Sequence, residues 1–135
     1  MDRKARIVIG QIVFWLYIAA VLYLCFGKFD DLSSVPRSIW GIPTDKVVHF
    51  CMFFPFPILA FFAFDPFTDT VRQSLLSCGL TFVIGVLVAA GTEFGQSFLP
   101  YRSGDHRDLV ADCTALLIST VIVFVIDTIK QRKHA

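Results

Sequence analysis

The sequence predicts an all-α polytopic membrane protein: four transmembrane helices in one domain over residues 1–135, with a polar cluster at the outer face. Of its 135 residues, 56% are hydrophobic, 15 are phenylalanine, and the mean hydropathy is +0.68. A soluble domain of this size has too much surface to hide so much apolar material. The charged residues gather at the chain ends and between long apolar runs. The net charge is only +1, so bulk charge gives no reason to expect a nucleic-acid partner.

The first predicted span covers residues 7–26, directly after the basic residues Arg3, Lys4 and Arg6. Its length matches the roughly 20 residues that an α-helix needs to cross about 30 Å of hydrocarbon. A basic start before an apolar run also describes a signal peptide. This run is too long for one, and no small-x-small cleavage motif follows it. We therefore expect an uncleaved first helix.

Three further spans are predicted at about residues 47–64, 74–99 and 108–129. The second contains Pro55 and Pro57, and each proline removes a backbone donor and disturbs a helix. We therefore expect the second helix to be bent or interrupted. Such a break is tolerated in a membrane only where neighbouring groups satisfy the freed carbonyls.

Small residues recur at four-residue spacing on the third and fourth spans. This spacing lets helices approach closely in lipid. The residues are Gly85, Ala89, Gly91 and Gly95 on the third span, and Ala111, Ala115 and Ser119 on the fourth.

The distribution of basic residues predicts the orientation. Lysine and arginine are enriched in cytoplasmic segments. With both ends inside, seven basic residues lie on the inner side and five on the outer side. We therefore expect both termini in the cytoplasm. The segment of residues 91–112, which joins the third span to the fourth, should then face out. The inner residues are Arg3, Lys4, Arg6, Arg72, Lys130, Arg132 and Lys133.

Polar residues are expected to meet in one shallow layer at the outer face. An even number of spans brings the start of the second, the end of the third and the start of the fourth to the same side. Each helix carries polar residues three or four apart, which lie on one helix face. Ionisable groups at this depth are costly and are taken as functional by default. The candidate binding residues are Asp45, Lys46, His49, Glu93, Gln96, Arg102, Asp105, Asp108 and Asp112.

Three interpretations of this cluster remain open. It could be a salt-bridge network that joins three helix ends. It could bind a polar or phosphorylated head group, with Arg102 and Lys46 holding phosphate. It could also be catalytic, with Glu93, His49 and Asp108 as acid–base candidates.

No Ser-His-Asp order, HExxH motif or glycine-rich phosphate loop is present. The acids and His49 could hold a divalent ion, but no recognised ligand spacing supports one, so no metal or cofactor is expected.

These motifs resemble the VanZ-like family of small bacterial integral membrane proteins over about residues 45–119. The chain differs from the family pattern in having Asp112 where asparagine is usual, and Ala115 and Ser119 where glycines are usual. The first difference raises the negative charge of the cluster. The matching motifs are Asp45-Lys46-x-x-His49-Phe50, Glu93-x-x-Gln96, and Arg102 followed by Asp105, Asp108 and Asp112.

The family takes its name from a member linked to glycopeptide-antibiotic resistance, so the resemblance implies a cell-envelope role in the bacterial inner (plasma) membrane. It implies membrane lipids as partners, including a phosphorylated or lipid-linked envelope intermediate that the protein binds or handles. It supplies no established reaction. A membrane-embedded hydrolase or transferase, and a structural partner of another envelope protein, remain the alternatives.

Overall fold

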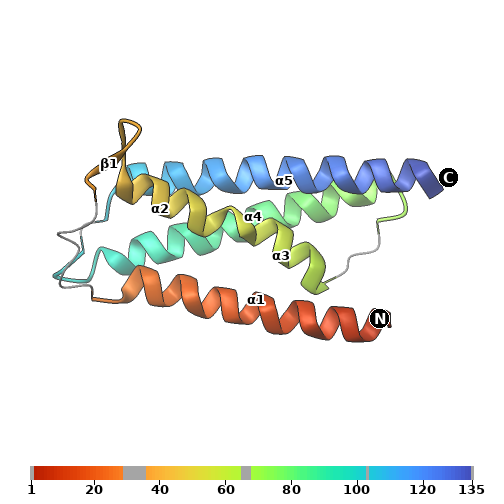
Figure 1. Cartoon of the computed structure of the whole chain (residues 1–135), viewed down its shortest axis with the longest axis horizontal. Coiled ribbons are helices and arrows are strands. Elements are labelled where there is room, and N and C mark those ends of the chain that lie inside the picture. The colour runs from red at the N-terminus through yellow and green to blue at the C-terminus, as the bar shows by residue number, and fades with distance from the viewer. Residues whose placement is uncertain (1, 29–35, 65–67, 103, 135) are drawn as a thin grey trace.

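The residues described by the computed structural model form long helices that run side by side (Figure 1). These residues are 2–28, 36–64, 68–102 and 104–134. Within them, four helical segments are long and apolar enough to cross a membrane, which confirms the predicted fold class. The helices are α1 (Arg3–Phe26), α2 (Thr44–Phe53), α3 (Pro55–Phe64), α4 (Val71–Gln96) and α5 (His106–His134).

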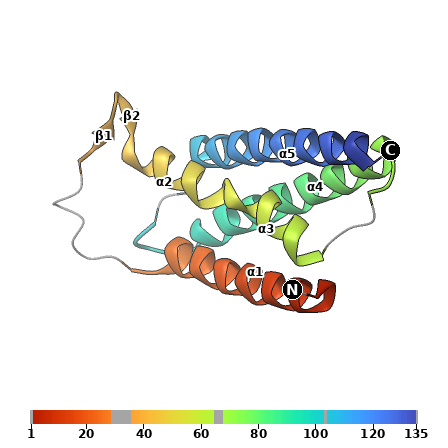
Figure 2. The ribbon, with the colours of Figure 1, turned by 45° about the vertical axis from the view of Figure 1, so that its right-hand side comes forward.

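The second span is interrupted, as the prolines predict. Helix α2 ends at Phe53 and α3 begins at Pro55, and the two follow one another along the bundle (Figures 1 and 2). The Tyr17 hydroxyl of α1 donates a hydrogen bond of 2.6 Å to the backbone carbonyl of Met52, close to this break. A neighbouring helix thus provides a donor where the regular backbone ladder is disturbed.

Local capping explains why α4 differs from its predicted bounds of 74–99. It begins at Val71 because Thr70 and Gln73 form a capping box, in which each side chain accepts a hydrogen bond from the other residue's backbone N–H. It ends at Gln96 rather than at Leu99. The following Pro100 disfavours helical geometry at Leu99, and the chain leaves the helix through tight turns.

A short hairpin precedes α2. Strands β1 (Ser38–Ile39) and β2 (Ile42–Pro43) pair antiparallel through a two-residue turn. Both turn residues, Trp40 and Gly41, have positive φ angles of 51° and 80°, which suits a hairpin turn that follows the strand twist. Trp40 is 98% exposed, as suits an aromatic side chain at a membrane–water interface.

The helices pack in pairs: α1 lies mainly against α3, α4 against α5, and α2 against α5. The approach of α1 to α3 is closest at Gly10, where an added Cβ would lie 2.7 Å from the Phe62 carbonyl oxygen. Gly85 and Gly95 also meet side chains of other helices, whereas an added Cβ at Gly91 would have nothing within 4 Å. Of the predicted Gly91–Gly95 motif, only Gly95 is therefore at a helix contact.

The start of α1 and the end of α5 lie at the same end of the bundle (Figure 1). The start of α2, the end of α4 and the start of α5 lie at the opposite end, together with the hairpin (Figure 2). The outer helix faces carry exposed leucine, valine, isoleucine and phenylalanine side chains. A bilayer is the solvent that such a surface fits.

Candidate functional site

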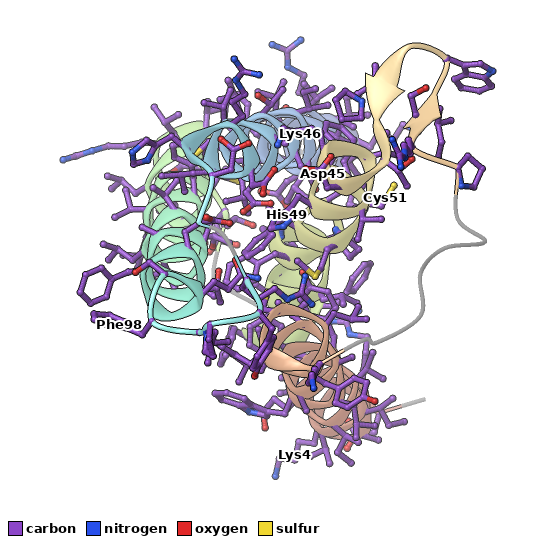
Figure 3. All side chains as sticks on the ribbon, turned by 90° about the vertical axis from the view of Figure 1, so that its left-hand side faces the viewer. Lys4, Asp45, Lys46, His49, Cys51 and Phe98 are labelled. Atoms are coloured by element: carbon purple, nitrogen blue, oxygen red, sulfur yellow. The ribbon has the colours of Figure 1, made fainter. Side chains whose placement is uncertain are left out.

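Three helix ends bring their polar residues together at the end of the bundle away from the termini. Figure 3 looks onto this end and shows Lys46 and His49 projecting from α2 toward α4 and α5. The spacing explains the common direction, because residues three or four apart lie on the same helix face. The contacts run from α2 to Glu93 of α4 and to Asp108 and Asp112 of α5.

His49 and Asp112 form the buried centre of this cluster. Nδ1 of His49 lies 3.1 Å and 3.3 Å from the two carboxylate oxygens of Asp112. Asp112 is 0% exposed and His49 is also buried. A buried carboxylate needs such a partner, because burial without one is strongly unfavourable. The pair therefore ties α2 to α5 at this depth.

Two more carboxylates face the same imidazole. Oε1 of Glu93 lies 3.9 Å from His49 Nδ1, and Oδ2 of Asp108 lies 3.8 Å from His49 Nε2. Both distances are too long for hydrogen bonds. The Glu93 Oε1 atom exposes less than 1 Å² and has no hydrogen-bond partner among the described residues. One buried oxygen of the cluster is thus left unsatisfied.

Lys46 joins the outer part of the cluster. Its ammonium group lies 3.0 Å from Asp45 and 2.8 Å from Asp105, and it also contacts Asp108. Hydrogen bonding from Lys46 lowers the pKa of the Asp105 carboxyl below its ordinary value. Asp105 also caps the N-terminus of α5, because its Oδ1 accepts a hydrogen bond of 2.9 Å from the Arg107 backbone N–H.

Exposure falls steadily from the outside of the cluster to its centre. The side chain of Asp45 is 58% exposed, that of Lys46 15%, that of Glu93 11% and that of Asp112 0%. The ionisable groups therefore form a continuous polar path from the end of the bundle into the helix interface. The carboxylates outnumber the cations along this path.

Gln96 and Arg102 contact α1 instead of the acidic cluster. Nε2 of Gln96 donates a 2.8 Å hydrogen bond to the Cys25 carbonyl, and the Arg102 guanidinium donates to the carbonyls of Leu24 and Gly27 at 2.9 Å and 3.1 Å. The last carbonyls of a helix have no partner within it. Both side chains therefore cap the end of α1.

Tyr101 belongs to the same cap and was not a sequence candidate. Its hydroxyl donates a 3.1 Å hydrogen bond to the Phe26 carbonyl. The partners are 75 residues apart, so no local spacing signals this contact. The only sequence signal was the position of the tyrosine beside Arg102, in the turn after a span.

This geometry allows three kinds of chemistry. The ion pairs can hold helix ends together, the polar path can receive a charged head group or a cation, and His49 oriented by a buried carboxylate is a possible acid–base group.

The chain is 35% identical over 111 residues to an uncharacterized protein of Schizosaccharomyces pombe. The match covers 79% of this chain and 61% of the relative, so the chain spans less than two thirds of that protein's length.

The family comparison agrees with the site motifs. No solved structure gives a significant match. The family model described as VanZ/LLP1 matches residues 14–127, a range that contains α2 to α4, most of α5 and every residue of the polar cluster. The chain belongs to the VanZ/LLP1 family of proteins.

Proposed function

We propose that this membrane protein binds the polar head group of an amphiphile at the cluster formed by α2, α4 and α5. The class we favour is a membrane lipid or a lipid-linked envelope intermediate, in a plasma membrane with both termini in the cytoplasm. The observation that supports this most is the continuous polar path, which runs from exposed Asp45 to fully buried Asp112 at the end of a lipid-facing bundle.

The surroundings of the path suit the two parts of an amphiphile. Val48, Phe94 and Phe98 project exposed apolar side chains from α2, from α4 and from the turn after α4. An acyl or prenyl chain can lie against such a surface while its head group reaches the charged residues. Because many ordinary membrane proteins also show apolar outer faces, the specificity must come from the cluster.

The charges of the cluster restrict the head group. Lys46 already contacts the carboxylates of Asp45, Asp105 and Asp108, and Arg102 contacts backbone carbonyls of α1. An anionic phosphate would have to displace one of the exposed carboxylates or gain a further cation. Amine and hydroxyl groups can hydrogen-bond to the carboxylates directly.

Native mass spectrometry of the purified protein tests this proposal. The protein would be mixed in detergent with phosphatidylethanolamine, phosphatidylglycerol or a polyprenyl phosphate. We expect one lipid class to remain bound, and Glu93→Gln to bind it at least 10-fold more weakly, because the charge is lost while the shape is kept. The control is Asp127→Asn, which alters a buried acid at the other end of α5.

Thermal stability separates the binding site from a structural network. If the cluster only joins helix ends, Glu93→Gln should lower stability while leaving lipid retention at the wild-type level. If wild type, Glu93→Gln and Asp127→Asn retain every lipid equally, the cluster plays no part in lipid recognition.

A second candidate is a membrane hydrolase or transferase. The observation in its favour is the His49–Asp112 pair, in which a fully buried carboxylate fixes the imidazole at Nδ1. A histidine oriented in this way can act as a general base. The same lipids would be incubated with wild type and with His49→Gln, and the products followed by mass spectrometry. Turnover by wild type alone would favour this function, and no turnover of a retained lipid would exclude it for that lipid.

A further inference from the structure

We infer that His49, Glu93 and Asp112 form a binding site for one divalent transition-metal ion. The ligand atoms would be Nδ1 of His49 and one carboxylate oxygen from each acid. They come from three different helices, α2, α4 and α5. This inference goes beyond the proposed function, because an ion can bind here whether or not a lipid does.

The three ligand atoms are already grouped at nearly the right separation. They all lie within 4.8 Å of one another. His49 Nδ1 is 3.1 Å from Asp112 Oδ1 and 3.9 Å from Glu93 Oε1. Ligands at about 2.0–2.2 Å from a shared ion lie about 3.0–3.5 Å apart. The Glu93 oxygen, at 3.9 Å from His49 Nδ1, would have to move closer to complete this geometry.

The unsatisfied oxygen of Glu93 points into this group. Its side chain is 11% exposed, its Oε1 atom exposes less than 1 Å², and that atom has no hydrogen-bond partner within residues 2–28, 36–64, 68–102 and 104–134. A buried acceptor left without a partner is unfavourable. A cation between Glu93, His49 and Asp112 would satisfy this oxygen and neutralise two carboxylates at a depth where charge is costly.

A carboxylate also faces the other side of the imidazole. A histidine that binds a metal through one ring nitrogen usually donates its other N–H to a carboxylate, and that carboxylate is held in turn. Here Nε2 faces Asp108 at 3.8 Å, and Asp108 contacts Lys46. At 3.8 Å this contact is beyond hydrogen-bond distance, so Asp108 would orient His49 only after a closer approach that accompanies ion binding.

The donor set selects the class of ion. One imidazole nitrogen and two carboxylate oxygens favour Zn²⁺, Mn²⁺ or Fe²⁺ over the all-oxygen sites of Ca²⁺ and Mg²⁺. Three protein ligands leave at least one coordination position open. The phosphate of a lipid head group could bind at this open position, where the ion would offset the negative charge of the carboxylates. Only this phosphate-binding role rests on the proposed function. The group of Asp45, Asp105 and Asp108 is not proposed as a site, because Lys46 already contacts all three.

The test is a metal titration of the detergent-purified protein in the absence of added lipid. The protein would carry no histidine tag and would have Cys51→Ser, which removes an exposed thiol. After chelation and buffer exchange, Zn²⁺ and Mn²⁺ would be titrated by calorimetry. We expect one ion per chain, at least 10-fold weaker binding in Glu93→Gln and Asp112→Asn, and a 10–100-fold loss in Asp108→Asn. Asp127→Asn should bind like wild type.

Electron paramagnetic resonance on bound Mn²⁺ gives a second, direct readout. Modulation from a coordinated ¹⁴N nucleus should appear in wild type and vanish in His49→Gln. Size-exclusion elution and helical content would check that each variant is folded. The inference is overturned if wild type binds neither ion below millimolar concentration, if Glu93→Gln and Asp112→Asn both bind like wild type, or if bound Mn²⁺ shows no nitrogen coupling. Because no lipid is added, these outcomes do not depend on the head-group proposal.

Discussion

At the scale of single residues, His49 and Asp112 form a buried pair at the polar end of the bundle. Asp112 is 0% exposed and its carboxylate lies 3.1 Å from His49 Nδ1. Removing one partner of a buried charged pair leaves the other charge uncompensated, whereas replacing both with apolar residues can be nearly neutral. The exposed contacts of Lys46 with Asp45 do not carry this penalty.

This difference gives a stability prediction. His49→Leu should destabilise the protein by about 3–5 kcal/mol, because Asp112 loses its partner. The double variant His49→Leu with Asp112→Leu should recover a large part of that loss. Asp45→Asn is the control and should change stability by only about 0–1 kcal/mol. The free energy of unfolding would be measured in mixed detergent with a chelator present.

The double-mutant cycle also states what would contradict the prediction. If the losses of the two single leucine variants simply add in the double variant, the two side chains are not coupled. The hydrogen bond between them would then have no measurable role in stability.

At the scale of elements, helix contacts in this bundle depend on where small residues lie relative to a neighbour. A glycine in a membrane helix is useful where two backbones meet and is otherwise only a weak helix former. Gly10 meets the backbone of α3, with an added Cβ 2.7 Å from the Phe62 carbonyl oxygen and 3.1 Å from Ala63 Cα. Gly91 meets nothing within 4 Å.

A matched pair of alanine substitutions tests this distinction. Gly10→Ala should destabilise the protein by about 1–3 kcal/mol, because the backbone of α3 must shift to admit the methyl group. Gly91→Ala should be neutral or stabilise it by up to about 1 kcal/mol, since alanine is the better helix former. Thermal unfolding in the same detergent would compare them. If both substitutions change the thermal stability equally, the close approach of α1 to α3 does not determine how well an alanine is tolerated.

At the scale of the whole molecule, the four helical segments long enough to cross a membrane within the described residues place the start of α1 and the end of α5 at one end and the polar cluster at the other. The lysine and arginine counts predict that the termini lie in the cytoplasm. The cluster would then face the outside of the cell, where a head group in the outer leaflet can reach it.

Reporter fusions test this orientation. A reporter that is active only in the cytoplasm should work when fused after Lys133 and fail when fused after Gly104, because one span separates these points. A reporter that is active only outside should give the reverse pattern. Activity of one reporter at both positions would contradict the four-span arrangement.

Much of the fold follows from the sequence because the signals are local. Apolar runs of about 20 residues specify spans through the thickness of the bilayer. Pro55 and Pro57 specify a break because proline lacks a backbone donor. The i,i+3 and i,i+4 spacings specify which polar residues share a helix face, and so predict that the polar faces of three helices meet. In the structure His49, Glu93 and Asp112 lie at this meeting point.

The tertiary structure alone decided which members of that polar set touch. Gln96 shares a helix face with Glu93, and Arg102 lies in the turn that follows. Both nevertheless cap α1, whose carbonyls lie more than 70 residues earlier in the chain. Nothing in the sequence indicated the contact of Gly10 with α3 either, because lipid-facing and helix-facing positions are both apolar in a membrane protein. Hydropathy and periodicity therefore determined the number of spans and their polar end. The grouping of three ligand atoms around one point depended on the rotation and approach of whole helices, which no local pattern specifies.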